Sequence, residues 1–108
     1  MGSTVRDNPD ESRYEIHDDG QLAGFSTYQL DTGRISFIHT EIGAAFTGRG
    51  LAGQLVSAEL DDARRRGLAV LPFCPLVRQY IADHPAYLDL VPPEDRGRFD
   101  LPADPAPQ

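Results

Sequence analysis

The chain has 108 residues, 40% of them hydrophobic, with 17 acidic side chains against 10 basic ones. This length fits one domain. The net charge of −7 argues against a nucleic-acid partner or an anionic membrane, because both need a basic face. All ten basic residues are arginine, which we interpret as the bias of a GC-rich bacterial genome, and no lysine is present to act as a nucleophile.

A single cysteine, Cys74, excludes an internal disulfide and is too few for a cysteine-rich zinc site. No set of histidines and carboxylates has the spacing of metal ligands, so no metal is expected. The N-terminus lacks the apolar core of a secretory signal, and no stretch approaches the roughly 20 apolar residues of a membrane span. We therefore expect a soluble cytoplasmic protein.

Composition divides the chain into three parts. The polar residues 1–12 are predicted to be a flexible N-terminus. Residues 92–108 contain five prolines and four acidic residues, which predicts an acidic tail without regular structure. The working domain is therefore expected within residues 13–91.

The first half of that domain has the pattern of three β-strands. Tyr14–His17, Gln21–Leu30 and Arg34–Ile42 are rich in aromatic and β-branched residues. Asp18–Gly20 and Asp31–Gly33 supply turn residues between them. Two tight turns between three strands predict an antiparallel meander.

The period then changes to that of a helix over residues 51–66. Its apolar side chains form one stripe, and Glu59, Asp61 and Asp62 are expected to point away from that stripe. Gly67 is a natural residue to follow the helix C-terminus. The apolar stripe consists of Ala52, Leu55, Val56, Leu60 and Ala63.

The wholly apolar stretch Leu68–Phe73 predicts a buried strand parallel to the third strand of the meander. Pro75 can open a second helix, and Pro85 can start one further turn. The predicted fold class is α+β, with helices layered on a mixed sheet.

The glycine-rich segment Thr47–Gly53 lies between a predicted strand and the start of a predicted helix. Glycines there let backbone N–H groups approach a ligand, and a helix N-terminus favours a phosphate. The alternative interpretation is a flexible connecting turn. A nucleotide P-loop is excluded because no Gly-Lys-Ser/Thr follows, and the glycine spacing of a dinucleotide site is also absent.

The order of meander, glycine loop, helix, parallel strand and helix resembles the core of the GNAT superfamily of N-acetyltransferases. That family's acetyl-CoA loop reads Arg/Gln-x-x-Gly-x-Gly/Ala. Gly50 and Ala52 match its last two fixed positions, whereas Thr47 stands where the family has Arg or Gln.

The resemblance is closer to a short branch of that superfamily, the one grouped with N-acetyltransferase domain-containing protein 1. It covers nearly all of residues 13–91. The shared positions, in chain order, are His39-Thr40-Glu41, the Gly-x-Gly-x-Ala loop, Cys74-Pro75, Tyr80-Ile81 and His84-Pro85-x-Tyr87.

What the resemblance implies is an acetyl-CoA site in the gap between the two parallel strands. The pantetheine would pair with the strand end from Thr40 to Ile42. Tyr80 and Tyr87 would flank the acyl group or its sulfur, and the alternative for at least one of them is a core aromatic. The two helices that usually wall the acceptor site are missing, so the acceptor cleft is either open or completed by a second subunit in a homodimer. The pyrophosphate would meet the amides of Gly48, Arg49, Gly50, Leu51 and Ala52.

His39 and Cys74 are expected at the same sheet edge, near the ends of the two parallel strands, with Cys74 in the active pocket and His39 facing it. A neutral histidine can take the proton of an attacking amine. Cys74 could be a nucleophile or could protonate the CoA thiolate. Glu41, on the same strand face as His39, could orient it or replace it as the base. The structural alternatives are a small buried hydrophobe for Cys74, a hydrogen-bonding group for His39 and an exposed carboxylate for Glu41.

The predicted function is N-acyl transfer from acetyl-CoA to an amine. The negative charge favours a cationic acceptor such as a polyamine, an aminoglycoside-like molecule or a basic peptide. The alternative is a module with a GNAT-like core that binds CoA or a protein and catalyses nothing. The acceptor, the acyl chain length, the choice of covalent or direct transfer and the oligomeric state stay open.

Overall fold

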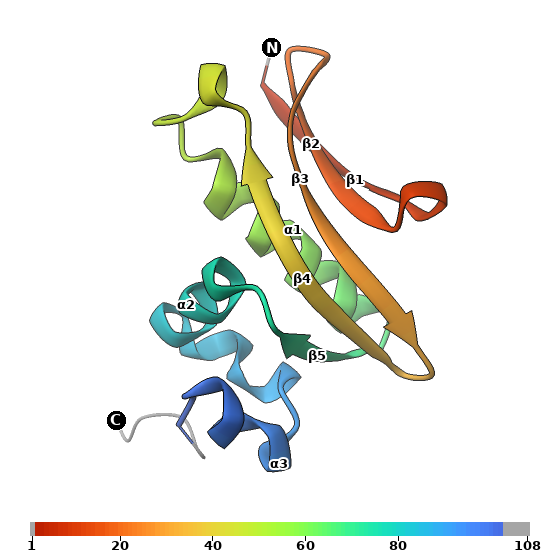
Figure 1. The fold of residues 1–108 in the computed structure, drawn as a ribbon, viewed down its shortest axis with the longest axis vertical. Coiled ribbons are helices and arrows are strands. Elements are labelled where there is room, and N and C mark those ends of the chain that lie inside the picture. The colour runs from red at the N-terminus through yellow and green to blue at the C-terminus, as the bar shows by residue number, and fades with distance from the viewer. Residues whose placement is uncertain (1, 103–108) are drawn as a thin grey trace.

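The computed structural model describes residues 2–102, whose strands form one sheet in the order β1-β2-β3-β4-β5 (Figure 1). Neighbouring strands are antiparallel from β1 to β4, and β4 pairs with β5 in parallel. This confirms the predicted α+β class. The strands are β1 (Ser3–Asn8), β2 (Arg13–Asp18), β3 (Gln21–Asp31), β4 (Arg34–Ile42) and β5 (Ala69–Pro72). The α-helices are α1 (Leu51–Arg65), α2 (Pro75–Asp83) and α3 (Pro93–Arg96), and the 3-10 turns are η1 (Pro9–Glu11), η2 (Ala44–Phe46), η3 (Pro85–Leu90) and η4 (Gly97–Phe99).

Both predicted turns of the meander form, and each contains residues with a positive φ. Asp19 and Gly20 take φ values of 50° and 83° between β2 and β3. Two successive residues of positive φ match the right-handed twist of the flanking strands. Gly33 takes a φ of 71° between β3 and β4. The sequence therefore predicted the meander correctly.

Strand β4 carries a bulge at Ile38. Tyr28 on β3 pairs with Phe37, but the preceding Thr27 pairs with His39. Between these two pairs β4 therefore has one extra residue, Ile38, that has no partner on β3. Side chains alternate between the two faces of a strand, and an inserted residue reverses that alternation. Phe37 is consequently buried and His39 exposed, although they are two residues apart.

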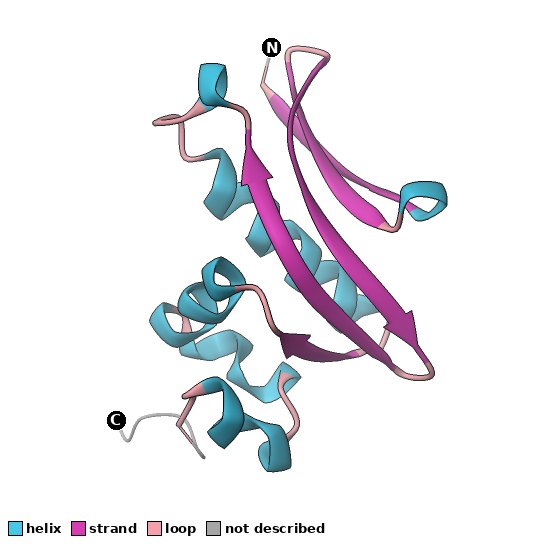
Figure 2. Ribbon diagram, in the orientation of Figure 1, coloured by secondary structure: helices cyan, strands magenta, loops and turns pink. Residues whose placement is uncertain are grey.

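Helix α1 lies across one face of the sheet and contacts all five strands (Figure 2). Its C-terminus has two reverse hydrogen bonds: the Leu68 N–H donates to the Ala63 carbonyl at 2.9 Å, and the Gly67 N–H to the Arg64 carbonyl at 3.1 Å. Gly67 takes a φ of 69°, as such a helix end requires. The predicted helix end is confirmed.

The buried stripe of α1 is not wholly apolar. Leu55, Leu60 and Ala63 are fully buried, and so is Glu59. The expectation that Glu59 points to solvent is therefore wrong. Its position explains this, because Glu59 lies four residues from both Leu55 and Ala63, and residues at that spacing share a helix face.

The first residues are not a flexible lead-in. Strand β1 pairs with β2 along its whole length, from Ser3 opposite Asp18 to Asn8 opposite Arg13. Val5 packs against the core from the centre of the strand. One apolar residue among six gives a weak strand signal, so the pairing depends on the neighbouring strand rather than on local propensity.

The predicted acidic tail also contributes to the core. Phe99 and Leu101 are buried, and the Phe99 ring meets the Phe73 ring edge-on at 5.1 Å. The Arg96 Nε donates to the Val91 carbonyl at 2.9 Å. Residues 103–108 of the predicted tail lie outside the described residues. Within residues 2–102, no helix is both long and apolar enough to cross a membrane.

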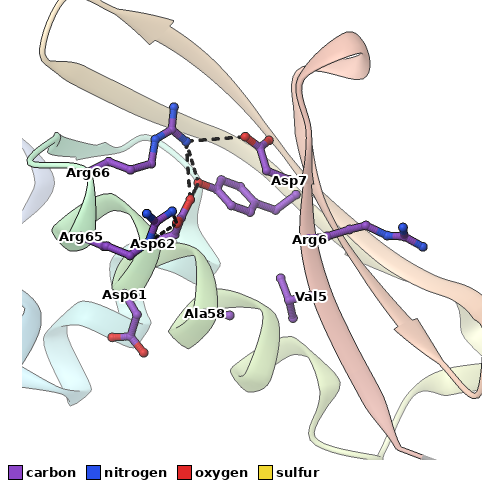
Figure 3. A pocket seen from close by; sticks show the side chains of 9 residues that line it. Val5, Arg6, Asp7, Ala58, Asp61, Asp62, Arg65 and Arg66 are labelled. Atoms are coloured by element: carbon purple, nitrogen blue, oxygen red, sulfur yellow. Dashed lines mark hydrogen bonds and ion pairs between the residues drawn. The ribbon is translucent and has the colours of Figure 1, made fainter.

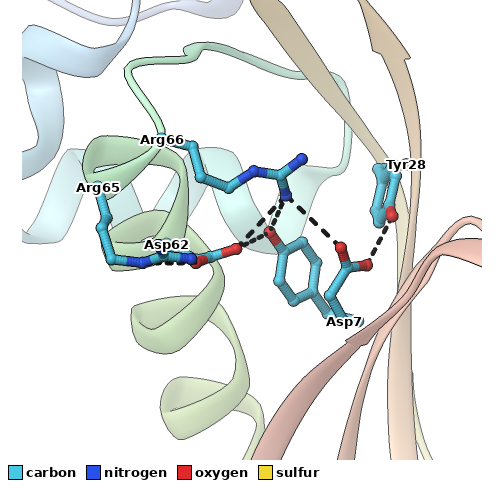
Figure 4. A network of polar contacts seen from close by, with 6 residues as sticks. Asp7, Tyr28, Asp62, Arg65 and Arg66 are labelled. Atoms are coloured by element: carbon cyan, nitrogen blue, oxygen red, sulfur yellow. Dashed lines mark hydrogen bonds and ion pairs between the residues drawn. The ribbon is translucent and has the colours of Figure 1, made fainter.

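A polar network anchors β1 and β3 to the end of α1 (Figure 4). The Tyr28 hydroxyl donates to Asp7 at 2.6 Å, and Asp7 lies 3.5 Å from the Arg66 guanidinium. The Tyr14 hydroxyl donates to Asp62 at 2.5 Å. Burial, followed by the hydrogen bond to Asp7, raises the pKa of Tyr28 well above its usual range, so this hydroxyl remains a donor.

Beside this network lies a hollow of about 590 Å³ between β1 and the C-terminal half of α1 (Figure 3). Its lining mixes arginine and aspartate side chains, including Arg6, Asp61 and Arg65. The Arg66 and Asp62 side chains on its wall are already paired with each other. It lies at the opposite end of α1 from the glycine loop, so it is separate from the site described below.

Replacing Asp7 with Ala should lower the free energy of unfolding by about 1–2 kcal/mol, because the buried Tyr28 hydroxyl loses its acceptor. Asp7→Asn keeps an acceptor and should lose less. Asp10→Ala in the exposed turn η1 is the control, expected within about 0.5 kcal/mol of wild type. Urea unfolding measures all three; equal stability of Asp7→Ala and Asp10→Ala would show that the network does not hold β1.

Candidate active site

The two parallel strands stay paired only over part of β4. Pairing runs from Arg34 opposite Ala69 to Phe37 opposite Pro72, and the Cys74 N–H adds one bond to the Phe37 carbonyl at 2.8 Å. The chain then turns away into α2, while β4 continues to Ile42 (Figure 1). The edge of β4 beyond Ile38 is therefore left without a strand partner on the β5 side, and its backbone groups can pair with a ligand.

The glycine loop lies beyond the end of this open edge. Gly48 and Gly50 take φ values of 80° and 75°, and Gly50 caps the N-terminus of α1. The first N–H groups of a helix have no acceptor within the helix, so they suit an anion. A hollow of about 190 Å³ here is lined by Ile42, Phe46, Thr47, Gly48, Gly50, Leu51 and Ala52. The structure thus brings together most of the residues predicted to bind the cofactor.

Arg49, also predicted to bind the cofactor, is engaged with protein groups. Its guanidinium lies 2.9 Å from Asp18 and 5.4 Å from the centre of the Phe46 ring. The side chain is 55% exposed, so a phosphate could replace Asp18 as its partner. The Thr47 hydroxyl donates to the Ala44 carbonyl at 3.1 Å and so closes the turn η2.

Tyr80, on α2, borders the first turns of α1. A Cβ added at Gly53 would lie 4.0 Å from the Tyr80 ring, an ordinary van der Waals contact, so the ring lies directly beside this turn of α1. The ring stacks on His84 with 4.0 Å between centroids. The Tyr87 hydroxyl instead bonds to Asp61 at 2.8 Å, a contact that holds η3 against α1.

His39 and Glu41 form an exposed pair on β4. The His39 Nε2 lies 3.2 Å from a Glu41 carboxylate oxygen, and both side chains are about 60% exposed. They share one face of the strand, as its two-residue period predicts. Because of the bulge at Ile38, that face is the one opposite α1.

Cys74 is buried and meets the other face of β4. Its thiol donates to the Thr40 hydroxyl at 3.3 Å. Thr40 in turn lies 3.1 Å from the Ser26 hydroxyl, which reaches α1. This differs from the expectation that His39 faces Cys74, since Thr40 takes that place and His39 lies across the sheet.

Glu59 completes this group and was missed by the sequence reasoning. The Ser26 hydroxyl donates to its Oε2 at 3.1 Å, while its buried Oε1 has no hydrogen-bond partner. Burial raises the pKa of Glu59 well above 4.5, the hydrogen bond from Ser26 opposes this, and the nearby Cys74 adds to the rise. The four-residue spacing from Leu55 and Ala63 was the signal that could have placed it inside.

Among residues 2–102, no three His, Cys, Asp or Glu side chains gather as a metal site requires. The groups available are an anion-binding loop, an open strand edge, a thiol on one face and a histidine–carboxylate pair on the other. This set suits acyl transfer from a thioester that carries phosphates.

The family model for GCN5-related N-acetyltransferases matches residues 13–90. The chain belongs to this family. It shares its fold with a GCN5-like protein of Staphylococcus aureus studied by NMR, with a TM-score of 0.63, 21% identity and coverage of 82% of this chain and 87% of that one. The Ard1 crystal structure from Thermoplasma volcanium matches with a TM-score of 0.53 and 14% identity, covering 65% of this chain and 70% of that one. No curated protein matches.

Membership of the GNAT family makes the chain an N-acetyltransferase. Acetyl-CoA is the general donor of these enzymes, and the glycine loop at the α1 N-terminus fits its pyrophosphate. The open edge of β4 has backbone groups without a strand partner, and these would be available to the pantetheine amides.

The buried Glu59 predicts an unusual dependence of stability on pH. Its pKa is raised in the folded state, so above pH 4.5 the folded chain holds a proton that the unfolded chain has lost. Relative to Glu59→Gln, the wild type should therefore lose stability as pH rises, with a slope of up to about 1.4 kcal/mol per pH unit. Urea unfolding across this range measures the slope.

The control for this measurement is Glu94→Gln, at an exposed position of α3. Its stability should follow the wild-type curve at every pH. Parallel curves for wild type and Glu59→Gln would contradict the prediction and show that Glu59 ionises normally.

Proposed function

We propose that this protein transfers an acetyl group from acetyl-CoA to a cationic amine, with the thioester placed between Cys74 and the exposed edge of β4. The observation that carries this proposal is that the groups suited to bind acetyl-CoA follow one another along α1 and β4. The anion-binding loop of Gly48–Ala52 comes first, the strand end Thr40–Ile42 follows, and Cys74 lies last, where the two parallel strands separate.

The two faces of β4 would then supply two different groups. His39 lies on the face opposite α1 and is open to solvent, so an amine can approach it. Its neutral imidazole would take the proton from the amine as the nitrogen attacks the thioester carbonyl carbon. Glu41, 3.2 Å away, would orient the ring and stabilise its charged form.

Cys74 would act on the leaving group. As the C–S bond breaks, its thiol proton passes to the CoA sulfur. Direct transfer is preferred over an acyl-cysteine intermediate, because an amine held beside a thioester needs no covalent relay. Burial and the contact with the Thr40 hydroxyl at 3.3 Å hold the Cys74 sulfur in place, and its proton turns from Thr40 to the CoA sulfur for the transfer.

The acceptor is proposed to be a small polyamine-like amine or a basic peptide. The net charge of −7 attracts such molecules, and Glu41 adds an exposed carboxylate beside the proposed base. Only the short turn η1 connects β1 to β2, so no long insertion there walls the acceptor side. A second subunit could complete it.

One feature favours the alternative of a CoA-binding module without catalysis. Thr47 stands at the position of the loop motif where an Arg or Gln is expected, and its hydroxyl is used within η2. Binding and turnover therefore need separate measurements.

Replacing Gly50 with Val should weaken CoA binding at least about tenfold in calorimetry, because a side chain at the α1 N-cap blocks backbone approach to the pyrophosphate. Gly33→Val is a matched control: both glycines have positive φ, 75° and 71°, and open space around the added Cβ. The control carries the same backbone strain away from the loop. Equal affinity in the two variants would mean that the site is misplaced.

Replacing His39 with Gln should lower kcat about 100-fold with little change in the KM for acetyl-CoA, because a general base acts in the chemical step. The assay follows thioester loss with a panel of polyamines and basic peptides. His17→Gln on β2 is the control and should keep the wild-type rate. Unchanged kcat in His39→Gln would remove His39 from the mechanism.

A further inference from the structure

A line of four side chains crosses the core from Cys74 to Glu59. Cys74 bonds to Thr40 at 3.3 Å, Thr40 to Ser26 at 3.1 Å, and Ser26 to Glu59 at 3.1 Å. The four residues come from β3, β4, α1 and the link between β5 and α2. Ser26 and Glu59 are fully buried, so water does not compete for these bonds.

The chemistry of the hydroxyl groups gives this line a direction. Each hydroxyl has one proton to donate. Since Ser26 donates to Glu59, it must accept from Thr40, and Thr40 accepts from Cys74. Reversing all three bonds gives the second consistent arrangement, in which a protonated Glu59 donates to Ser26, Ser26 to Thr40 and Thr40 to the Cys74 sulfur, so that the Cys74 S–H is left for the CoA sulfur.

Nothing else in the described core accounts for a carboxyl at this position. Glu59 has Ser26 as its hydrogen-bond partner, its Oε1 has none, and Leu55 and Ala63 flank it on the helix face. An apolar side chain would fill the same place without an unpaired oxygen. Among the described residues, the hydrogen bonds that start at Glu59 lead through Ser26 and Thr40 to Cys74.

We propose that Glu59 is the proton store of the active site and supplies Cys74 through Ser26 and Thr40. This rests on the proposed function. As the Cys74 S–H bond breaks and the CoA S–H bond forms, Thr40 passes its proton to Cys74, Ser26 passes one to Thr40, and Glu59 passes one to Ser26. The net change moves one proton from Glu59 to the CoA sulfur.

The store refills by the reverse route. After CoA has left, a proton from water enters at Cys74, and the three bonds shift back until Glu59 is again a carboxylic acid. Glu59 touches no substrate in this scheme and acts only through Cys74. Neutralisation by the returning proton also ends the unfavourable burial of its charge.

The first test is infrared spectroscopy on the protein alone at neutral pH, which needs no acceptor. We expect the carbonyl band of a buried carboxylic acid in wild type and its loss in Glu59→Gln. The band should shift in Cys74→Ala, because the line of bonds loses its end. The same Cys74→Ala change should cause no shift in a Thr40→Val background, where the line is already cut.

The second test is turnover of acetyl-CoA with the amine found in the panel. Glu59→Gln and Ser26→Ala should each lower kcat about tenfold, with the KM for acetyl-CoA within about twofold. The double variant should be no slower than either single one, because both cut the same route. Thr40→Ser keeps a hydroxyl and should keep most of the rate that Thr40→Val loses.

The outcomes separate this proposal from the proposed function. Absence of the infrared band, or a Cys74→Ala shift that persists in Thr40→Val, overturns the proton store whatever the turnover shows. Wild-type kcat in Glu59→Gln with a slow Cys74→Ala overturns the relay while leaving Cys74 in its role. Full turnover in Cys74→Ala overturns the role of Cys74 itself, and the relay with it.

Discussion

The extra residue at Ile38 determines which side chains of β4 meet the core and which meet solvent. Before it, Ile35 and Phe37 pack under α1; after it, Thr40 takes that side. Without the bulge, His39 would continue the buried series and Thr40 would be exposed. The placement of the His39 imidazole on one face and the Cys74 thiol on the other depends on this single change of register.

The bulge lies where the parallel pairing of β4 with β5 ends. Phe37 is the last residue of β4 opposite β5, and its carbonyl also accepts the Cys74 N–H. At the same level the chain after β5 leaves the sheet to enter α2, while β4 continues past the bulge to Ile42. The same few residues therefore open the gap, bring the thiol to its end and orient the side chains along it.

The sequence predicted correctly those turns and helix ends that depend on the backbone preference of a few neighbouring residues. The turns at Asp19-Gly20 and Gly33 and the end of α1 at Gly67 follow from the preference of glycine for positive φ. The glycine loop was predicted on the same ground, and the structure gathers its residues around one hollow.

What the sequence could not predict depends on partners far along the chain. The bulge has no local signal, because Ile38 fits a regular strand as well as a bulge. Strand β1 forms because β2 presents an edge to it, and Asp7 then finds Tyr28 and Arg66. Glu59 could have been placed by helix spacing, but its link to Cys74 requires the register of β3 and β4.

The buried group of Cys74, Thr40, Ser26 and Glu59 also bears on how so small a domain holds its shape. Each member comes from a different segment, so the bonds fix β3, β4, α1 and the start of α2 relative to one another. The price is an unpaired carboxyl oxygen in the centre of α1, which an apolar residue would avoid. Stability alone does not explain a carboxyl at this position. A role in taking up and returning a proton away from water would explain it.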